Sequence, residues 1–194
     1  MSTMPRPRLT PEEYLEIERK AEFKSEYYDG EMFAMSGARL AHNLIAGNVI
    51  GGLHFQIRGR SCAVYPSDMR VRVSATGLYT YPDVVVVRGK PQLADNEMDN
   101  LLNPTVLVEV LSPTTEAYDR GRKFEHYRKI ESLRQYLLVA SDRVSVELFT
   151  RQSDGQWLLS SAAGPEDEIG LESIECRLRV ADIYDKVQFE VEPG

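Results

Sequence analysis

Two continuous apolar runs dominate the hydrophobic pattern of the chain, and each carries one carboxylate. Residues 81–87 and 105–111 are rich in valine and leucine. Such runs are typical of central strands covered on both faces. Asp83 lies at the start of the first run, whereas Glu109 lies inside the second. An unpaired carboxylate in that position would cost several kcal/mol, so the pattern predicts a partner for Glu109.

Apolar residues at helical spacing predict a long helix over residues 38–57. Three glycines interrupt this pattern, at positions 47, 51 and 52. Each lowers helix stability by about 1 kcal/mol relative to alanine. We expect close packing of the glycines against the sheet to compensate.

A second helix is predicted over residues 116–130, after the turn at residues 112–115, which ends in a helix N-cap candidate. Within it Asp119, Lys123 and Tyr127 are spaced by four and therefore share one face. This spacing allows Lys123 to reach back toward the ends of the two strands.

Shorter elements surround these segments. Residues 1–9 are expected to be flexible, and Asp29-Gly30 favours a tight hairpin turn. In residues 68–73 Met69, Val71 and Val73 form a buried face, and the alternating polar residues a solvent face. The pattern predicts helices over 10–21 and 180–186, a helical turn within 93–102, and strands over 23–28, 31–35, 62–65, 68–73, 134–140, 144–148, 157–159 and 171–174.

Length and composition indicate a single domain over residues 1–194, since 42% of the residues are hydrophobic and supply one core. The sequence has no long apolar stretch and no charged-then-apolar leader, so we expect a cytoplasmic protein without a membrane partner. Cys62 and Cys176 lack metal-ligand spacing and are expected to be reduced thiols.

The formal net charge of −7 argues against a nucleic-acid partner, but its distribution weakens the objection. From residue 152 onward there are 10 acidic and 3 basic residues, so residues 1–151 are neutral. We therefore treat residues 151–194 as an acidic, β-rich extension that closes the sheet or mediates self-association. Basic residues cluster at 58–60, 70–72 and 120–129, a pattern equally typical of ordinary solvated faces.

The two strand carboxylates and the helix lysine together predict a chemistry. If the strands are neighbours, Asp83 and Glu109 point into one cleft and suit a hard divalent cation. Two acidic metal ligands and a lysine match metal-assisted phosphodiester hydrolysis, in which the ammonium of Lys123 stabilises developing negative charge. Each of these residues also has a structural alternative without catalysis. Asp83 would be a turn residue, Glu109 would form a buried ion pair, and Lys123 would pair with Asp119 along the helix.

Two further residues have open roles. Glu31, just after the hairpin turn, is either a solvated hairpin residue or an additional acid at the cleft. His42, in the first turns of the long helix, either approaches a substrate phosphate or is structural.

The order of these elements and motifs resembles the PD-(D/E)XK nuclease superfamily and, within it, the Uma-two family of restriction-endonuclease-like proteins. The similarity covers about residues 9–184. It rests on Tyr28-Asp29-Gly30-Glu31, His42, Pro82-Asp83-Val84, Val108-Glu109-Val110-Leu111-Ser112-Pro113, and Asp119-Arg120 with Lys123 and Tyr127. The resemblance implies an α/β fold with a mixed central sheet flanked by helices, in the core order helix-strand-strand-strand-helix-strand, plus an N-terminal β-hairpin and a C-terminal β extension. Residues 69–73 are expected to be the first strand of this core.

The resemblance also implies a Mg²⁺-dependent or Mn²⁺-dependent endonuclease acting on DNA. Asp83, Glu109 and the carbonyl of Val110 would hold the metal. The superfamily lysine, two residues after the acid, is replaced here by Leu111, so Lys123 is the natural substitute. Candidates for supporting or phosphate-contacting roles are Glu31, His42, Asp119, Arg120 and Tyr127.

A competing hypothesis is a non-catalytic nucleic-acid-binding or assembly module of the same fold. The displaced lysine and the acidic C-terminal part motivate it. Either function predicts weak DNA affinity unless a homodimer pairs the basic patches.

Overall fold

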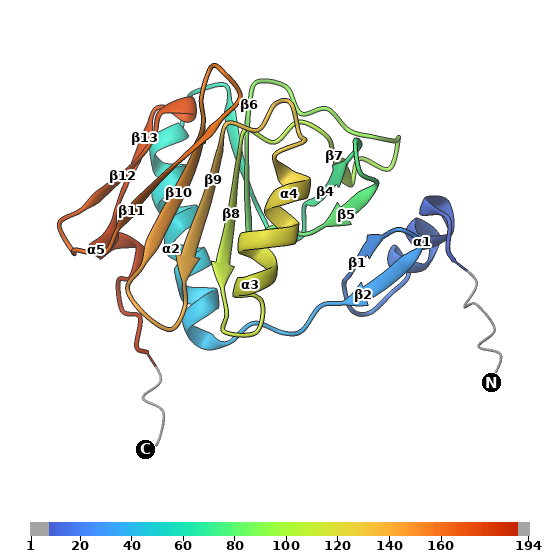
Figure 1. The fold of residues 1–194 in the computed structure, drawn as a ribbon, viewed down its shortest axis with the longest axis horizontal. Coiled ribbons are helices and arrows are strands. Elements are labelled where there is room, and N and C mark those ends of the chain that lie inside the picture. The colour runs from blue at the N-terminus through green and yellow to red at the C-terminus, as the bar shows by residue number, and fades with distance from the viewer. Residues whose placement is uncertain (1–7, 190–194) are drawn as a thin grey trace.

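A six-stranded mixed sheet forms the centre of the computed structural model, which describes residues 8–189 (Figure 1). Its strand order is β11-β10-β9-β8-β6-β3. The two apolar runs form β6 (Val84–Arg88) and β8 (Val106–Leu111), which pair antiparallel, and β8 pairs parallel with β9 (Gln135–Ala140). Every residue of β8 and β9 is buried, as predicted for central strands.

The outer strands differ from the prediction at one place. β3 (Cys62–Pro66) pairs antiparallel with β6, whereas β4 (Arg70–Val73) belongs to a second sheet. The prediction of residues 69–73 as the first strand of the core is therefore wrong. On the other side, β10 (Val146–Arg151) pairs with β9, and β11 (Trp157–Ala162), from the C-terminal extension, pairs with β10 as the edge strand of the sheet.

Helices cover both faces of the central sheet (Figure 1). α2 (Leu40–Ile57) packs on one face, against alternate valines of β6 and β8. The helical segment after β8 covers the other face and packs through Phe124 and Tyr127. Because the strands are sandwiched, a polar side chain on either face must find its partner inside the protein.

The glycines of α2 only partly follow the prediction of close packing. A Cβ atom added at Gly52 would lie 3.1 Å from Leu178 Cδ2, on β13 (Cys176–Arg179) rather than on the central sheet. Gly47 and Gly51 face open space instead.

The second sheet has the strand order β2-β1-β5-β4-β7. β1 (Ser25–Tyr28) and β2 (Glu31–Ala34) form the predicted hairpin, and β1 also pairs with β5 (Leu78–Thr80). The positive φ angles of Asp29 (48°) and Gly30 (84°) confirm the tight turn. Figure 1 shows that this hairpin and α1 (Pro11–Glu18) lie to one side of the central sheet.

The N-terminal residues within the described range are fixed rather than flexible. The backbone N–H of Leu9 donates to Gly30 O at 3.0 Å, and Arg8 pairs with Asp29. Thr10 caps α1 through the predicted capping box. Residues 1–7 of the segment predicted to be flexible lie outside the described residues.

Two predictions between residues 68 and 102 are wrong. Residues 93–102 form no helical turn: Leu93 bridges to Leu101, and β7 (Asn100–Leu101) pairs parallel with β4. Arg70 does not face solvent. Its guanidinium is buried, and hydrogen bonds to Tyr81 Oη at 2.8 Å and to Asn100 Oδ1 at 3.2 Å satisfy it there.

The C-terminal part covers α2. β12 (Glu168–Leu171) pairs with β13, and α5 (Val180–Ile183) follows directly. Residues 172–174 form a 3-10 turn, so the strand predicted at 171–174 is misplaced. Residues 190–194 of the acidic extension lie outside the described residues. Both cysteines are free thiols, as predicted, and no helix in the described part of the chain is long and apolar enough to cross a membrane.

Candidate active site

A π-helical turn interrupts the helix predicted at residues 116–130. α3 (Glu116–Tyr118) runs into the π turn (Asp119–Lys123) and then into α4 (Phe124–Tyr127). π turns are rare and occur often at functional sites. The turn does not break the predicted face, because the side chains of Asp119, Lys123 and Tyr127 are all buried.

Lys123 reaches the central sheet and lies among three carboxylates. Its Nζ is 2.9 Å from Glu109 Oε1, 3.1 Å from Glu26 Oε1 and 3.5 Å from Asp119 Oδ1. Burial lowers the pKa of Lys123, but the carboxylates of Glu109, Glu26 and Asp119 outweigh it and raise the pKa well above its ordinary value. The three carboxylates therefore favour the charged form of this buried side chain.

For Glu109, in contrast, the pKa shift favours the uncharged form of the side chain. Its side chain is only 5% exposed, and burial raises its pKa well above the ordinary value, although Lys123 opposes the shift. The nearby carboxylates of Asp119 and Asp83 raise the pKa further. Tyr127 Oη donates a hydrogen bond of 2.7 Å to Glu109 Oε1. Three carboxylates, those of Glu109, Glu26 and Asp119, therefore surround a single ammonium.

Asp83 lies just before β6, at the end of the sheet where β8 finishes. The backbone N–H of Val110 donates to Asp83 Oδ2 at 2.7 Å, which joins the two predicted acidic strands directly. His42 Nε2 of α2 lies 3.3 Å from the same oxygen. Burial opposes protonation of His42, but Asp83 outweighs it and raises the pKa of the imidazole. His42 therefore belongs to the cluster.

Glu26 is the residue of this cluster that sequence reasoning missed. It lies on β1, where Thr80 Oγ1 and Tyr118 Oη donate hydrogen bonds to its two carboxylate oxygens. Glu26 has no ligand-like spacing to Asp83 or Glu109 in the sequence. It reaches Lys123 because β1 pairs with β5 across the second sheet, a contact that local pattern does not encode.

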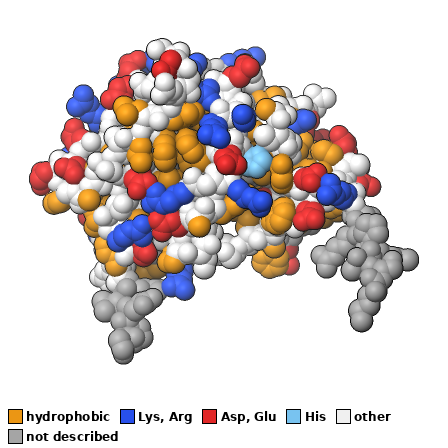
Figure 2. Space-filling view, viewed as in Figure 1, with side chains coloured by type: hydrophobic (Ala, Val, Ile, Leu, Met, Phe, Trp, Pro, Cys, Tyr) orange, Lys and Arg blue, Asp and Glu red, His pale blue; other side chains and the backbone are white. Residues whose placement is uncertain are grey.

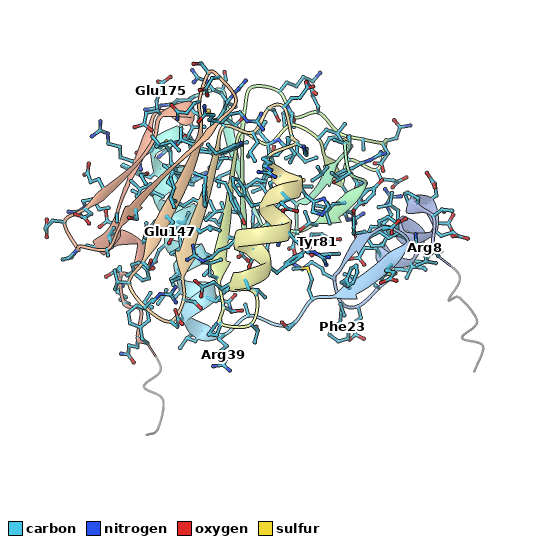
Figure 3. The ribbon with its side chains drawn as sticks, viewed as in Figure 1. Arg8, Phe23, Arg39, Tyr81, Glu147 and Glu175 are labelled. Carbon is cyan, nitrogen blue, oxygen red and sulfur yellow. The ribbon has the colours of Figure 1, made fainter. Side chains whose placement is uncertain are left out.

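Two sequence candidates stay outside the cluster. Glu31 is exposed at the start of β2, so of its two predicted roles the solvated hairpin residue fits the structure. Arg120 pairs with Glu116 at 2.8 Å and with Glu147 on β10. In Figure 3 the labelled Glu147 and Tyr81 lie on opposite sides of the helical segment after β8, so Arg120 faces away from the hairpin. Arg120 is therefore held in ion pairs outside the carboxylate cluster, and its phosphate-contacting role stays a prediction.

The surface over this helical segment carries mixed charge. Figure 2 shows acidic and basic side chains interspersed on this face, without an extended area of one sign. Neither the net charge nor this face therefore resembles a broad basic nucleic-acid surface.

The donor set of the cluster fits a hard divalent cation by its chemistry. Asp83 and Glu109 supply carboxylate oxygens from adjacent strands, and the carbonyl of Val110 lies on the same strand as Glu109. Within residues 8–189, no three His, Cys, Asp or Glu side chains already have metal-site geometry. Lys123 shares Glu109 with any such cation, since its Nζ is 2.9 Å from that carboxylate.

A mixed central sheet flanked by helices, with one acid on β8 and one just before the adjacent β6, is typical of a restriction-endonuclease-like fold. The chain belongs to the Uma2 family, as its motifs predicted: the model of that family, described as "Putative restriction endonuclease", matches residues 11–181.

Relatives and a solved structure agree with this assignment. Uncharacterized protein slr1290 of Synechocystis sp. (strain ATCC 27184 / PCC 6803 / Kazusa) is 36% identical over 185 residues, which cover 95% of this chain and 96% of the relative. Uncharacterized protein sll1609 of the same organism is 37% identical over 161 residues, covering 83% of this chain and 91% of the relative. The crystal structure of a putative nuclease belonging to DUF820 from Anabaena variabilis ATCC 29413 is similar with a TM-score of 0.76 at 18% identity, covering 93% of this chain and 99% of that one. The fold is therefore nuclease-like.

Proposed function

We propose that this protein is a divalent-metal-dependent endonuclease that hydrolyses phosphodiester bonds of DNA at the cluster around Lys123. One observation carries the proposal: a buried ammonium lies within 3.5 Å of the carboxylates of Glu26, Glu109 and Asp119. The Asp83 carboxylate adds to the negative charge at Glu109. Membership of the Uma2 family supports the same reaction class.

In this proposal Asp83, Glu109 and the Val110 carbonyl hold Mg²⁺ or Mn²⁺. The metal, when bound, supplies an activated water and stabilises negative charge at the phosphate. Lys123 donates a hydrogen bond to a phosphate oxygen or orients the attacking water, because its ammonium remains charged.

The neighbouring side chains position the two acids. Tyr127 Oη fixes Glu109 through a hydrogen bond of 2.7 Å. His42 and the Val110 N–H fix the orientation of Asp83 through the same carboxylate oxygen. Asp119 adds negative charge beside Lys123 and so keeps the ammonium protonated.

The first test is the melting temperature in EDTA, Mg²⁺ and Mn²⁺. We expect a metal-dependent rise for the wild type that disappears in Asp83→Ala/Glu109→Ala, because a ligand that binds only the folded state stabilises it. Glu31→Ala is the matched control, since this carboxylate is exposed and outside the cluster. An equal rise in the melting temperature of the double variant would show that the metal binds elsewhere.

The second test is cleavage of plasmid DNA with Mn²⁺ or Mg²⁺. Asp83→Asn and Glu109→Gln keep the side-chain shape and should abolish cleavage while folding is retained. A fully active Glu109→Gln would contradict the proposal.

A non-catalytic binding or assembly module is the competing function, and one contact favours it: the ion pair between Lys123 and Glu109 already satisfies the buried carboxylate. This function predicts DNA binding without cleavage, no metal-dependent melting shift, and equal binding by Asp83→Ala and the wild type.

A further inference from the structure

A cavity lined mainly by polar residues lies at the opposite end of the central sheet from Asp83. It has a volume of about 620 Å³ and is lined by Arg88, Arg134 and Arg151. Arg88 ends β6, Arg151 ends β10, and Arg134 immediately precedes β9. The sheet register brings these ends together, because Gln135 pairs with both Val106 of β8 and Thr150 of β10.

The cavity is separate from the carboxylate cluster. Leu138, the β9 partner of Glu109, is four residues beyond Arg134. At about 3.3 Å per residue, this spacing corresponds to about 13 Å along the strand.

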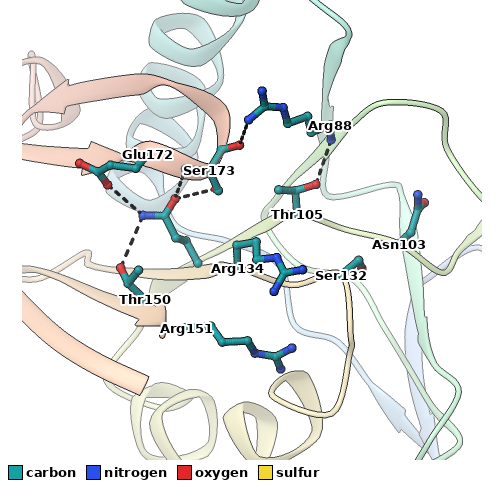
Figure 4. Close-up of a pocket in the computed structure, with 10 residues that line it drawn as sticks. Arg88, Asn103, Thr105, Ser132, Arg134, Thr150, Arg151, Glu172 and Ser173 are labelled. Carbon is teal, nitrogen blue, oxygen red and sulfur yellow. Dashed lines mark hydrogen bonds between the residues drawn. The ribbon is translucent and has the colours of Figure 1, made fainter. Parts of the chain in front are cut away.

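Hydrogen bonds build the floor of the cavity from the side chain of Gln135. Its Nε2 donates to Gly170 O at 3.1 Å, and its Oε1 accepts from both the N–H and the hydroxyl of Ser173. Figure 4 shows Arg88 toward the top of the cavity, with Arg134 and Arg151 below it. The floor is thus held rigidly by groups that are already satisfied, which leaves the arginines to meet a ligand.

The three guanidinium groups differ in how far the protein itself satisfies them. Arg88 donates to Ser173 O at 2.8 Å and pairs with Glu175, and Arg151 donates to the carbonyls of Glu131 and Arg128. Across residues 8–189, the guanidinium of Arg134 makes neither a hydrogen bond nor an ion pair. The N–H groups of the Arg134 guanidinium are therefore available to bind a ligand.

Positive charge is concentrated here without full compensation. Burial lowers the pKa of Arg151, and the neighbouring Arg134 lowers it further, since two like charges face one another. Glu172 also lines the cavity, but its Oε2 accepts from Gln135 Nε2 at 3.4 Å. With Arg88 paired to Glu175, the guanidiniums of Arg134 and Arg151 face the single lining carboxylate of Glu172, and this leaves an excess of positive charge that attracts an anion.

We propose that this cavity is a binding site for a phosphoryl group, with Arg134 as its principal donor and the charge of Arg151 beside it. Planar guanidiniums bind phosphate oxygens in a bidentate manner, and both side chains enter the same cavity. The ligand is either a free phosphate or mononucleotide, or the backbone phosphate of a nucleic acid. The proposal goes beyond the proposed cleavage, because it holds whether or not the carboxylate cluster cuts DNA.

Calorimetric titration of the full chain tests the proposal, in EDTA and at fixed ionic strength. The probes are inorganic phosphate, adenosine 5′-monophosphate and a short DNA duplex. Arg134→Gln removes a side chain with no internal hydrogen bond, so it should fold like the wild type. We expect it to weaken binding about tenfold, the value of one charge-assisted contact. The charge-matched control is Lys20→Gln, an exposed residue beside α1, which should bind like the wild type.

The outcomes separate the two sources of phosphate. Binding of phosphate and the mononucleotide, weakened by Arg134→Gln, supports the site with a small ligand. Binding of the duplex alone, with the same dependence on Arg134, supports it with nucleic acid. Affinities that are the same in Arg134→Gln/Arg151→Gln and in the wild type, or no binding of any probe, would overturn it. EDTA prevents metal-dependent cleavage, so these results are independent of the proposed nuclease activity.

Discussion

Lys123 Nζ lies 2.9 Å from Glu109 Oε1, and both side chains are buried between the central sheet and the helical segment that covers it. This pair explains how a carboxylate is tolerated inside a strand of valines and leucines. The pair is not isolated, however, because Glu26 and Asp119 also face Lys123. One ammonium is thus shared by three carboxylates.

Replacement of Lys123 by methionine should destabilise the protein strongly. The change leaves buried carboxylates without their cation, and breaking a buried pair costs about 3–5 kcal/mol. The free energy of unfolding, measured by urea denaturation, should fall by this amount. The double variant Lys123→Met/Glu109→Gln should recover part of the loss. An unchanged free energy for Lys123→Met would mean that the pair contributes nothing to stability.

Glu26 and Glu31 offer a matched comparison within one hairpin. Glu26→Gln removes a carboxylate that lies 3.1 Å from Lys123, so cleavage of DNA and the metal-dependent melting shift should both decrease. Glu31→Gln removes an exposed carboxylate from the paired strand and should change neither quantity. Equal behaviour of the two variants would show that the hairpin contributes no functional acid.

The sequence predicted the parts of the cluster that local pattern encodes. Lys123 follows from the spacing of its helix, and Glu109 from its place inside an apolar run. The contact between Asp83 and the backbone of Val110 follows once these two strands are neighbours.

The remainder depends on contacts between distant segments. Glu26 joins the cluster because β1 pairs with β5. Arg70 looked like a solvent-facing residue of an alternating strand, yet the Tyr81 hydroxyl and Asn100 satisfy it inside the protein. Periodicity predicts which face of a strand a residue occupies, but not which segment covers that face.

Asp99 should make stability depend on pH in acid. The hydrogen bond from Arg19 lowers its pKa below the ordinary value of 3.8, with Arg70 contributing. A lowered folded-state pKa gives stability that is present above 3.8 and is lost as the pH falls through the folded value. Asp99→Asn should therefore cost about 1 kcal/mol near neutral pH and almost nothing in strong acid.

Urea denaturation across this pH range would measure the effect of Asp99→Asn. Glu97→Gln is the control, because this exposed side chain makes no hydrogen bond or ion pair within residues 8–189. A constant difference between Asp99→Asn and the wild type at all pH values would contradict the assignment.

Two glycines of α2 test whether close packing justifies their presence. Gly47→Ala should raise the free energy of unfolding by about 1 kcal/mol, because alanine favours the helix and the added Cβ meets open space. Gly52→Ala gains the same helix propensity, but its Cβ would lie 3.1 Å from Leu178 Cδ2 on β13. The gain should therefore be smaller or reversed, as measured by urea denaturation. If both variants gained equally, β13 would have room to move away from α2, and Gly52 would not be required for their contact.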